Sequence, residues 1–398
     1  MTMRGRSLEA GTTRLPGVDV LRGLSIVLVV LHHTGLRIPL AASPLARRLP
    51  EDVVDTLMAR GFEAVYVFFA ISGFVITRHA LARWGALGRL DIRAFYASRA
   101  ARILPSLALL VAALAGLAAA GVRHYEIDRP GQSIAGAVAA AIGFRINWYE
   151  SATGYLPASW DVLWSLSVEE AFYLGFPLAC LTLGRSRALV PVLAGFALAL
   201  PWWREGLHGL WREKADAPGM AAIACGVLAA LATHRWPAMP RSTARWLTAF
   251  GVLALLAAGP FEEALWHSVH QGFLLVVALA AAALCMASAW NTAHRSNGMT
   301  ARLMDVAGAP LRSFGRLSYE IYLTHIFAMW WVVDAFDAHG APPAAVLPAL
   351  LASLCLAWLL GWIAARGWSA PAARWVMSAM SRCGARIATP PASERPAC

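Results

Sequence analysis

The sequence predicts an all-α fold, a polytopic transmembrane helical bundle of about ten spans with both termini in the cytoplasm. Of its 398 residues 59% are hydrophobic and 14% are charged, whereas soluble domains carry about 25% charged residues. Apolar stretches of about 20 residues, long enough to cross the hydrocarbon core of a bilayer, recur along the whole chain. The backbone must satisfy its own hydrogen bonds in lipid, so these stretches are expected to be helical.

Ten apolar stretches are predicted to span the membrane, with ends placed to within about 2–4 residues. They cover residues 18–36, 62–81, 103–121, 162–183, 188–203, 217–233, 246–260, 269–290, 317–333 and 344–365. The stretch 133–147 is apolar but shorter, and it carries Arg145 and Asn147 near its end. We therefore expect a re-entrant or interfacial helix there, with a full span as the alternative.

The positive charges indicate which ends of the spans face the cytoplasm. A net charge of +11 can indicate nucleic-acid binding, but here the basic residues lie in short loops between apolar stretches. The loops and ends on the side of the N-terminus hold 24 basic residues, and those on the other side hold 10. The positive-inside rule therefore places both termini in the cytoplasm and makes a nucleic-acid partner unnecessary. An eleventh span at 133–147 would reverse every later loop and remove this agreement.

The chain shows no internal repeat, and its six cysteines are isolated, without a CxxC pair. Neither a disulfide framework nor a metal site is therefore predicted. We expect one transmembrane domain over residues 1–366 and a cytoplasmic tail over 367–398. The start of this tail holds Trp368, Arg374 and Trp375, so it is expected to be amphipathic and to lie on the inner membrane surface, with disorder beyond it.

The first predicted span carries the most informative polar residues. Ionisable groups are costly inside a bilayer, so each one is a functional hypothesis. Arg22 and His33 are eleven residues apart, which places them on one helix face with a rise of about 16 Å between them. Asp19 lies one turn before Arg22 and can pair with it. The alternative is that Arg22 snorkels to the surface and that His33 only bonds a neighbouring helix.

Two further pairs of polar residues follow along the chain. Arg99 and Arg102 lie at i and i+3 at the cytoplasmic start of the third span, an arrangement that suits a phosphate group. The alternative is that they only set the topology or bind lipid headgroups. Glu169 and Glu170 point about 100° apart on a helix, so one can face a cavity while the other bonds a partner; a structural salt bridge between helices is the alternative.

A serine in the second predicted span and a polar stripe in the ninth complete the candidates. Ser72, followed by Gly73, is expected to permit close helix contact, and no Gly-x-Ser-x-Gly elbow supports a nucleophilic role for it. Ser318, Tyr322 and His325 lie at i, i+4 and i+7 and form one polar stripe. This stripe either faces an internal cavity or forms a hydrogen-bonded seam between helices.

Taken together, these segments resemble the acyltransferase-3 family of bacterial membrane proteins, which includes O-antigen and exopolysaccharide acetyltransferases. The matching motifs occur in the order of the family and cover nearly the whole chain: LRGLSIVLVVLHH (21–33), FFAISGFVIT (68–77), RAARILP (99–105), NW (147–148), WSLSVEEAFYLGFP (164–177) and SYEIYLTH (318–325). The chain departs from the family at Tyr66, where the family often has Asp, at Val162, where it often has His, and at Glu320, where it has Ser.

The resemblance assigns roles to the polar residues. The Arg-x10-His pattern of the family falls on Arg22 and His33, which implies that His33 is the catalytic histidine. Its paired-arginine motif falls on Arg99 and Arg102, which are then expected to bind acyl-CoA together with Arg22. Glu170 or Glu169 would assist His33. The supporting candidates are Asp19, Ser72, Trp164, Ser167, Tyr322 and His325.

The resemblance implies transfer of an acyl group, by default acetyl, from acyl-CoA to a hydroxyl of a carbohydrate-type acceptor. No permanently bound cofactor is expected. The partners would be acyl-CoA, a glycan or glycolipid and membrane lipids, and the location would be the bacterial cytoplasmic (inner) membrane. The alternative function is a proton-coupled transporter or flippase, since intramembrane His and Glu are expected there too. Transporters usually show repeats, and none is apparent.

Overall fold

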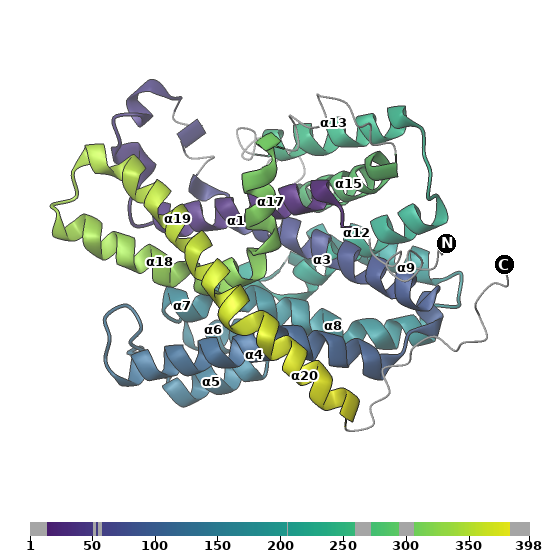
Figure 1. The fold of residues 1–398 in the computed structure, drawn as a ribbon, viewed down its shortest axis with the longest axis horizontal. Helices are drawn as coiled ribbons and strands as arrows, with labels where there is room; N and C mark the ends of the chain where they lie inside the picture. Colours follow the sequence, from purple (N-terminus) through teal and green to yellow (C-terminus); the bar gives the residue numbers. More distant parts are fainter. Residues whose placement is uncertain are drawn as a thin grey trace, which may run out of the picture.

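The computed structural model describes residues 14–50, 53–54, 58–204, 206–258, 272–293 and 306–382. Throughout these ranges the regular elements are helices, and no strand occurs (Figure 1). The predicted all-α fold is therefore confirmed. The expected disordered tail beyond residue 382, the end of the predicted span 246–260 and the start of the span 269–290 lie outside the described residues.

The longer helices form the body of the molecule. They are α1 (Pro16–Gly35), α3 (Gly61–Trp84), α4 (Ile92–Ala119), α8 (Trp164–Leu183), α12 (Asp216–Arg235), α13 (Arg241–Ala257), α15 (Phe273–Ala293), α18 (Ser318–Ala338), α19 (Val346–Ala364) and α20 (Ala370–Arg382). Shorter helices connect them. These are α5 (Ile134–Ile142), α6 (Ile146–Thr153), α7 (Ala158–Asp161), α9 (Leu189–Leu198), α10 (Leu200–Arg204), α11 (Gly209–Lys214) and α17 (Ala309–Arg316). Short 3-10 helices lie at Leu40–Ala42, Ala46–Arg48, Leu87–Arg89 and Pro343–Ala345, and a π-helix at Ala365–Ser369 joins α19 to α20.

Seven helical segments of the described chain are long and apolar enough to cross a membrane. They correspond to seven of the ten predicted spans: Pro16–Gly35, Gly61–Trp84, Ile92–Ala119, Ala158–Leu183, Gly209–Arg235, Phe273–Thr292 and Pro343–Ala379. The remaining predicted spans correspond to α9, α13 and α18. Of these, α18 has 21 residues but carries polar side chains along its length, and α13 has 17 residues. The total of ten spans and the side on which the termini lie remain predictions.

The predicted span 188–203 was wrong as a single helix. Helix α9 has only ten residues and ends at Leu198, and α10 begins after a break at Ala199. Pro201 explains the break, because proline has no backbone N–H to donate to the carbonyl four residues earlier and its ring collides with that carbonyl. Ten helical residues rise about 15 Å, half of the hydrocarbon thickness.

The stretch 133–147 also contains no long helix. Helix α5 has nine residues, a rise of about 13 Å, and α6 follows after a turn at Gly143, Phe144 and Arg145. Phe144 adopts a positive φ of 53° at this turn, which reverses the chain. No helix in this stretch is long enough to cross a bilayer by itself, which favours the predicted re-entrant or interfacial helix.

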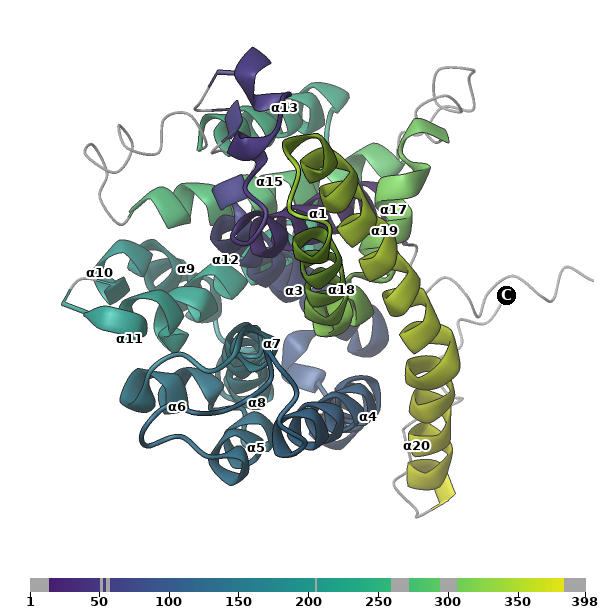
Figure 2. The ribbon, with the colours of Figure 1, turned by 90° about the vertical axis from the view of Figure 1, so that its left-hand side faces the viewer.

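Helices α1 and α3 pack against each other at the centre of the bundle (Figures 1 and 2). Helix α12 lies along α3, and α15, α17, α18 and α19 contact α1. Glycines permit the closest approaches, as predicted at Gly73. A Cβ atom at Gly73 would lie 2.0 Å from the carbonyl oxygen of Ile223 on α12, and one at Gly226 would lie 1.8 Å from that of Ala70 on α3.

Replacing Gly226 by alanine is expected to destabilise the protein by at least about 2 kcal/mol, because the new methyl group collides with backbone that cannot rotate away. The control is Gly116→Ala on α4, where a Cβ atom would have no neighbour within 4 Å. Alanine should be neutral or stabilise that helix by up to about 1 kcal/mol. Thermal unfolding in one detergent measures both, and equal stability of the two variants would contradict the close packing of α3 on α12.

Candidate active site

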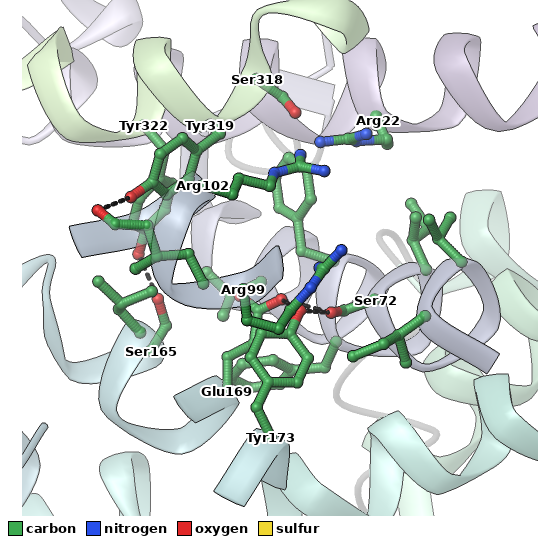
Figure 3. A pocket seen from close by; sticks show the side chains of 18 of the residues that line it. Arg22, Ser72, Arg99, Arg102, Ser165, Glu169, Tyr173, Ser318, Tyr319 and Tyr322 are labelled. Carbon is green, nitrogen blue, oxygen red and sulfur yellow. Dashed lines mark hydrogen bonds between the residues drawn. The ribbon is translucent and has the colours of Figure 1, made fainter. Parts of the chain in front are cut away.

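A pocket opens between five helices, and six of the twelve predicted site residues line it (Figure 3). Its empty volume, including the space at the open mouth, is about 940 Å³. Helices α1, α3, α4, α8 and α18 contribute its polar side chains, which are Arg22, Ser72, Arg99, Arg102, Ser165, Glu169, Tyr173, Ser318, Tyr319 and Tyr322. The sequence had singled out six of these ten as site residues.

Three arginines converge on the pocket. Arg22 comes from α1, and Arg99 and Arg102 come from the second and third turns of α4, whose start is fixed by the Asp91 carboxylate accepting from the Ala94 N–H at 3.0 Å. Figure 3 shows the guanidinium groups of Arg22 and Arg102 pointing toward one another. None of the three forms an ion pair within 4 Å with any described residue.

This arrangement favours an anionic ligand. Like charges held together without counterions raise the free energy of the empty pocket, and an anion relieves that repulsion. The Nε atom of Arg99 is also buried without a hydrogen-bond partner in the described structure, and its guanidinium carbon lies 5.6 Å from the centroid of the Tyr173 ring. Guanidinium groups bind phosphate oxygens through paired N–H donors, so the pocket is suited to a phosphorylated ligand.

The carboxylate that faces this pocket belongs to Glu169. Its Oε1 atom accepts short hydrogen bonds from the hydroxyls of Ser72 and Tyr173, and these two hydroxyl oxygens lie 2.5 Å apart. The three side chains therefore join α3 to α8 at the base of the arginine pocket. Ser72 has a polar role in addition to the packing role of its neighbour Gly73, and Glu169 is the base that its hydroxyl contacts among the described residues.

Glu170 lies outside the pocket. It is buried and points about 100° away from Glu169 around the helix. Its Oε1 atom has no hydrogen-bond partner within the described ranges. The expectation that one glutamate faces a cavity is met by Glu169. The other glutamate was expected to bond a partner, but the Oε1 atom of Glu170 has none among the described residues.

His33 lies beyond the pocket, further along α1. Its ring is half-buried and does not line the pocket. Its Nδ1 atom is 2.8 Å from the Val29 carbonyl and 3.3 Å from Nε2 of His325. His325 is connected to the pocket through its own helix, because its Nδ1 is 2.8 Å from the carbonyl of Tyr322, whose side chain lines the pocket. The polar stripe on α18 therefore runs from the pocket to His33.

Three supporting candidates have structural partners instead. Asp19 was expected to pair with Arg22, but its carboxylate pairs with Arg14 at 3.1 Å. Arg14 precedes the helix, and its side chain extends along the first turn. The Ser167 hydroxyl accepts from the Ile146 N–H and donates to the Leu163 carbonyl. The Trp164 ring lies against Phe62 and Phe69, with ring centroids 6.0 and 6.2 Å apart. None of these three lines the pocket.

Comparison with known proteins identifies the family of this chain. A family model described as an acyltransferase domain matches residues 15–362, nearly the whole described chain. The chain belongs to the acyltransferase-3 family. The matched range contains the three arginines, Glu169, His33 and His325.

The similar curated proteins are named as O-acetyltransferases. The chain is 23% identical over 334 residues to peptidoglycan O-acetyltransferase OatA of Listeria monocytogenes, covering 78% of this chain and 49% of that protein. It is 27% identical over 177 residues to a putative O-acetyltransferase of Staphylococcus aureus strain COL, and 25% identical over 175 residues to O-acetyltransferase OatA of S. aureus strain NCTC 8325. These alignments cover 42% and 41% of this chain, and 25% and 24% of those proteins. The chain thus spans half or less of these relatives, and no solved structure matches it.

Two tyrosines of this acyltransferase that line the pocket, Tyr173 and Tyr319, were not predicted as site residues from the sequence. Each had a signal: Tyr173 follows Glu169 by four residues, which places both on one helix face, and Tyr319 directly follows Ser318. A buried ionic group at α6, α7 and α11 was not predicted either. There the Lys214 ammonium donates to Glu150 at 2.7 Å and makes a shorter contact with Asp161.

This ionic group is almost closed to solvent, since the side chains of Lys214 and Glu150 are 3% and 0% exposed. Burial, followed by the charge of Asp161, raises the pKa of Glu150, and Lys214 opposes that rise. The ammonium therefore stabilises two carboxylates that would otherwise repel one another in a poorly solvated place.

Replacing Lys214 by methionine is expected to cost about 3–5 kcal/mol of stability, because it leaves buried carboxylates without a cation. The double variant Lys214→Met, Glu150→Gln should recover part of the loss, since the glutamine can still accept from the Leu156 N–H that now bonds Glu150 at 2.9 Å. Unfolding in detergent measures both variants. If the double variant is no more stable than the single one, Lys214 does not act by neutralising Glu150.

Proposed function

We propose that this acyltransferase is a membrane-bound O-acetyltransferase, which moves an acetyl group from acetyl-CoA to a hydroxyl of a glycan or glycolipid. The observation that carries the proposal is the pocket with three arginines that form no ion pair with any described residue, from which the polar stripe of α18 leads to His33. The names of the similar proteins favour acetyl as the acyl group and a glycan as the acceptor.

The phosphates of acetyl-CoA would bind to Arg22, Arg99 and Arg102. From Arg22 to His33 the helix rises about 16 Å, comparable to an extended pantetheine arm of order 15–20 Å, so the thioester would reach the histidine. The end of the bundle that carries these arginines is predicted to face the cytoplasm of a bacterium across its inner membrane. Acetyl-CoA is available on that side.

His33 would act as a general base on the acceptor hydroxyl. The hydroxyl proton passes to the imidazole as the oxygen attacks the thioester carbonyl. The C–S bond then breaks, and the departing thiolate of CoA takes the proton from the imidazolium. Glu169, with Ser72 and Tyr173, would bind the polar pantetheine arm or orient the acceptor from the other wall of the pocket.

Purified protein in lipid nanodiscs tests the proposal with acetyl-CoA labelled in the acetyl group. With added peptidoglycan fragments or cell-envelope glycans, we expect release of CoA and labelled ester on the glycan. The alternative, a proton-coupled transporter or flippase, would also use intramembrane groups such as His33 and Glu170. Movement of a glycan across proteoliposomes without consumption of acetyl-CoA would support the transporter and contradict the enzyme.

A further inference from the structure

His33 meets a second histidine from the far end of the sequence. His325 of α18 is completely buried, and its ring centroid lies 5.0 Å from that of His33. The closest atoms are Nε2 of His325 and Nδ1 of His33, at 3.3 Å. Two imidazoles in this relation cannot both present an N–H or both present a lone pair to each other, so the protonation of each ring must be complementary.

The backbone partners determine which nitrogen carries the hydrogen in each ring. Nδ1 of His33 is 2.8 Å from the carbonyl of Val29, and Nδ1 of His325 is 2.8 Å from the carbonyl of Tyr322. A carbonyl oxygen can only accept, so both Nδ1 atoms carry a hydrogen. In a neutral His325 the Nε2 atom then holds a lone pair, and that lone pair faces the Nδ1–H of His33.

Nε2 of His33 is the ring nitrogen that can act as a base. Nε2 of His33 has no hydrogen-bond partner among the residues that the structure describes, and in the Nδ1–H form it holds the basic lone pair. The other titratable groups that act on His33 are its neighbour His32, with ring centroids 5.3 Å apart, and Asp161 of α7. Neither of them hydrogen bonds to the ring.

We infer that His325 is a positioning residue: its Nε2 lone pair accepts from the Nδ1–H of His33 together with the Val29 carbonyl, which leaves Nε2 of His33 free as the base, and it stabilises the imidazolium that forms during transfer. This inference rests on the proposed function. The proton taken from the acceptor hydroxyl resides on Nε2 of His33 and leaves from there with CoA. The Nδ1–H remains in place throughout and points at His325 and the Val29 carbonyl, and His325 itself gains or loses no proton.

Two variants of His325 separate this role from packing. In His325→Gln the amide N–H can still donate to the Tyr322 carbonyl while the amide oxygen accepts from His33. In His325→Phe only the ring volume remains. We expect the phenylalanine variant to lose about 100-fold or more in kcat, within the range of a general base, with KM for acetyl-CoA changed less than about threefold. The glutamine variant should keep at least about a tenth of the activity.

The pH profile gives a readout that packing would not change. An accepting lone pair stabilises the imidazolium form of its partner, so the loss of this lone pair disfavours protonation of His33. The acidic limb of the kcat profile should therefore move to lower pH in His325→Phe and remain near its original position in His325→Gln. Equal kcat and equal profiles in both variants would overturn the inference.

Nitrogen NMR of histidine-labelled protein in nanodiscs tests the tautomer without any turnover. The His33 signals, assigned by their loss in His33→Gln, should show a protonated Nδ1 and an unprotonated Nε2 in the wild-type protein. The reverse tautomer would overturn the inference even if acetyl transfer is confirmed. If the protein transfers no acetyl group but shows the expected tautomer, the proposed function fails and the pairing of the two rings stands.

Discussion

Replacing His33 by alanine is expected to lower the rate of acetyl transfer at least about 1000-fold, because a positioned general base contributes about 10²–10⁴-fold. The protein should still fold. His33 is half-buried, and its contacts in the described structure are the Val29 carbonyl, within its own helix, and His325. Transfer of labelled acetyl and size-exclusion chromatography measure the two properties on the same sample.

The adjacent residue provides a matched control. His32 points about 100° away from His33 on the helix, and its Nδ1 lies 2.8 Å from the carbonyl of Met58, so its role is to fix the loop before α3. His32→Gln can keep a donor for that carbonyl and should retain most of the activity. A His33→Ala variant that is nearly as active as the wild type would remove His33 from the mechanism.

Replacing Arg102 by alanine is expected to raise the KM for acetyl-CoA about 10- to 100-fold with a smaller change in kcat. A hydrogen bond to a charged group contributes about 1.5–3 kcal/mol, and each 1.4 kcal/mol corresponds to a tenfold change in binding. Arg102 is exposed at the mouth of the pocket beside Arg22 (Figure 3), so its loss removes a phosphate contact without disturbing the core.

Arg93 is the control for this variant, since it is an exposed arginine of the same helix and the same basic stretch but does not line the pocket. Arg93→Ala should leave the KM for acetyl-CoA within about twofold of the wild type. Isothermal titration with CoA in detergent gives the same comparison without turnover. Equal effects of the two substitutions would indicate that the basic stretch acts only through its overall charge.

The sequence predicted those parts of the site that depend on helical periodicity within one helix. Arg22 and His33 share a face because eleven residues complete about three turns, and Arg99 and Arg102 share one because they are three apart. The close packing at Gly73 followed from the absence of a side chain. The resemblance to the acyltransferase-3 family supplied the order of the motifs, and the family match confirms it.

Features that depend on how helices are placed next to one another could not be predicted in this way. Periodicity gives the 100° between Glu169 and Glu170, but only the packing of α8 on α3 determines that Glu169 faces Ser72 and the pocket. The contact of His33 with His325 joins residues 292 positions apart. The ionic group of Lys214 joins three separate short helices. The break at Ala199, in contrast, had a local signal in Pro201.

A structure with a non-hydrolysable acetyl-CoA analogue, determined by electron cryomicroscopy in nanodiscs, tests the central claim most directly: one ligand joins the arginine pocket to His33. The account predicts phosphate groups within hydrogen-bond distance of Arg22, Arg99 or Arg102, and a pantetheine arm that passes Tyr322 and ends with the acetyl group next to Nε2 of His33. Phosphates bound elsewhere, or an acetyl group that ends at Ser72 and Glu169 far from His33, would contradict it.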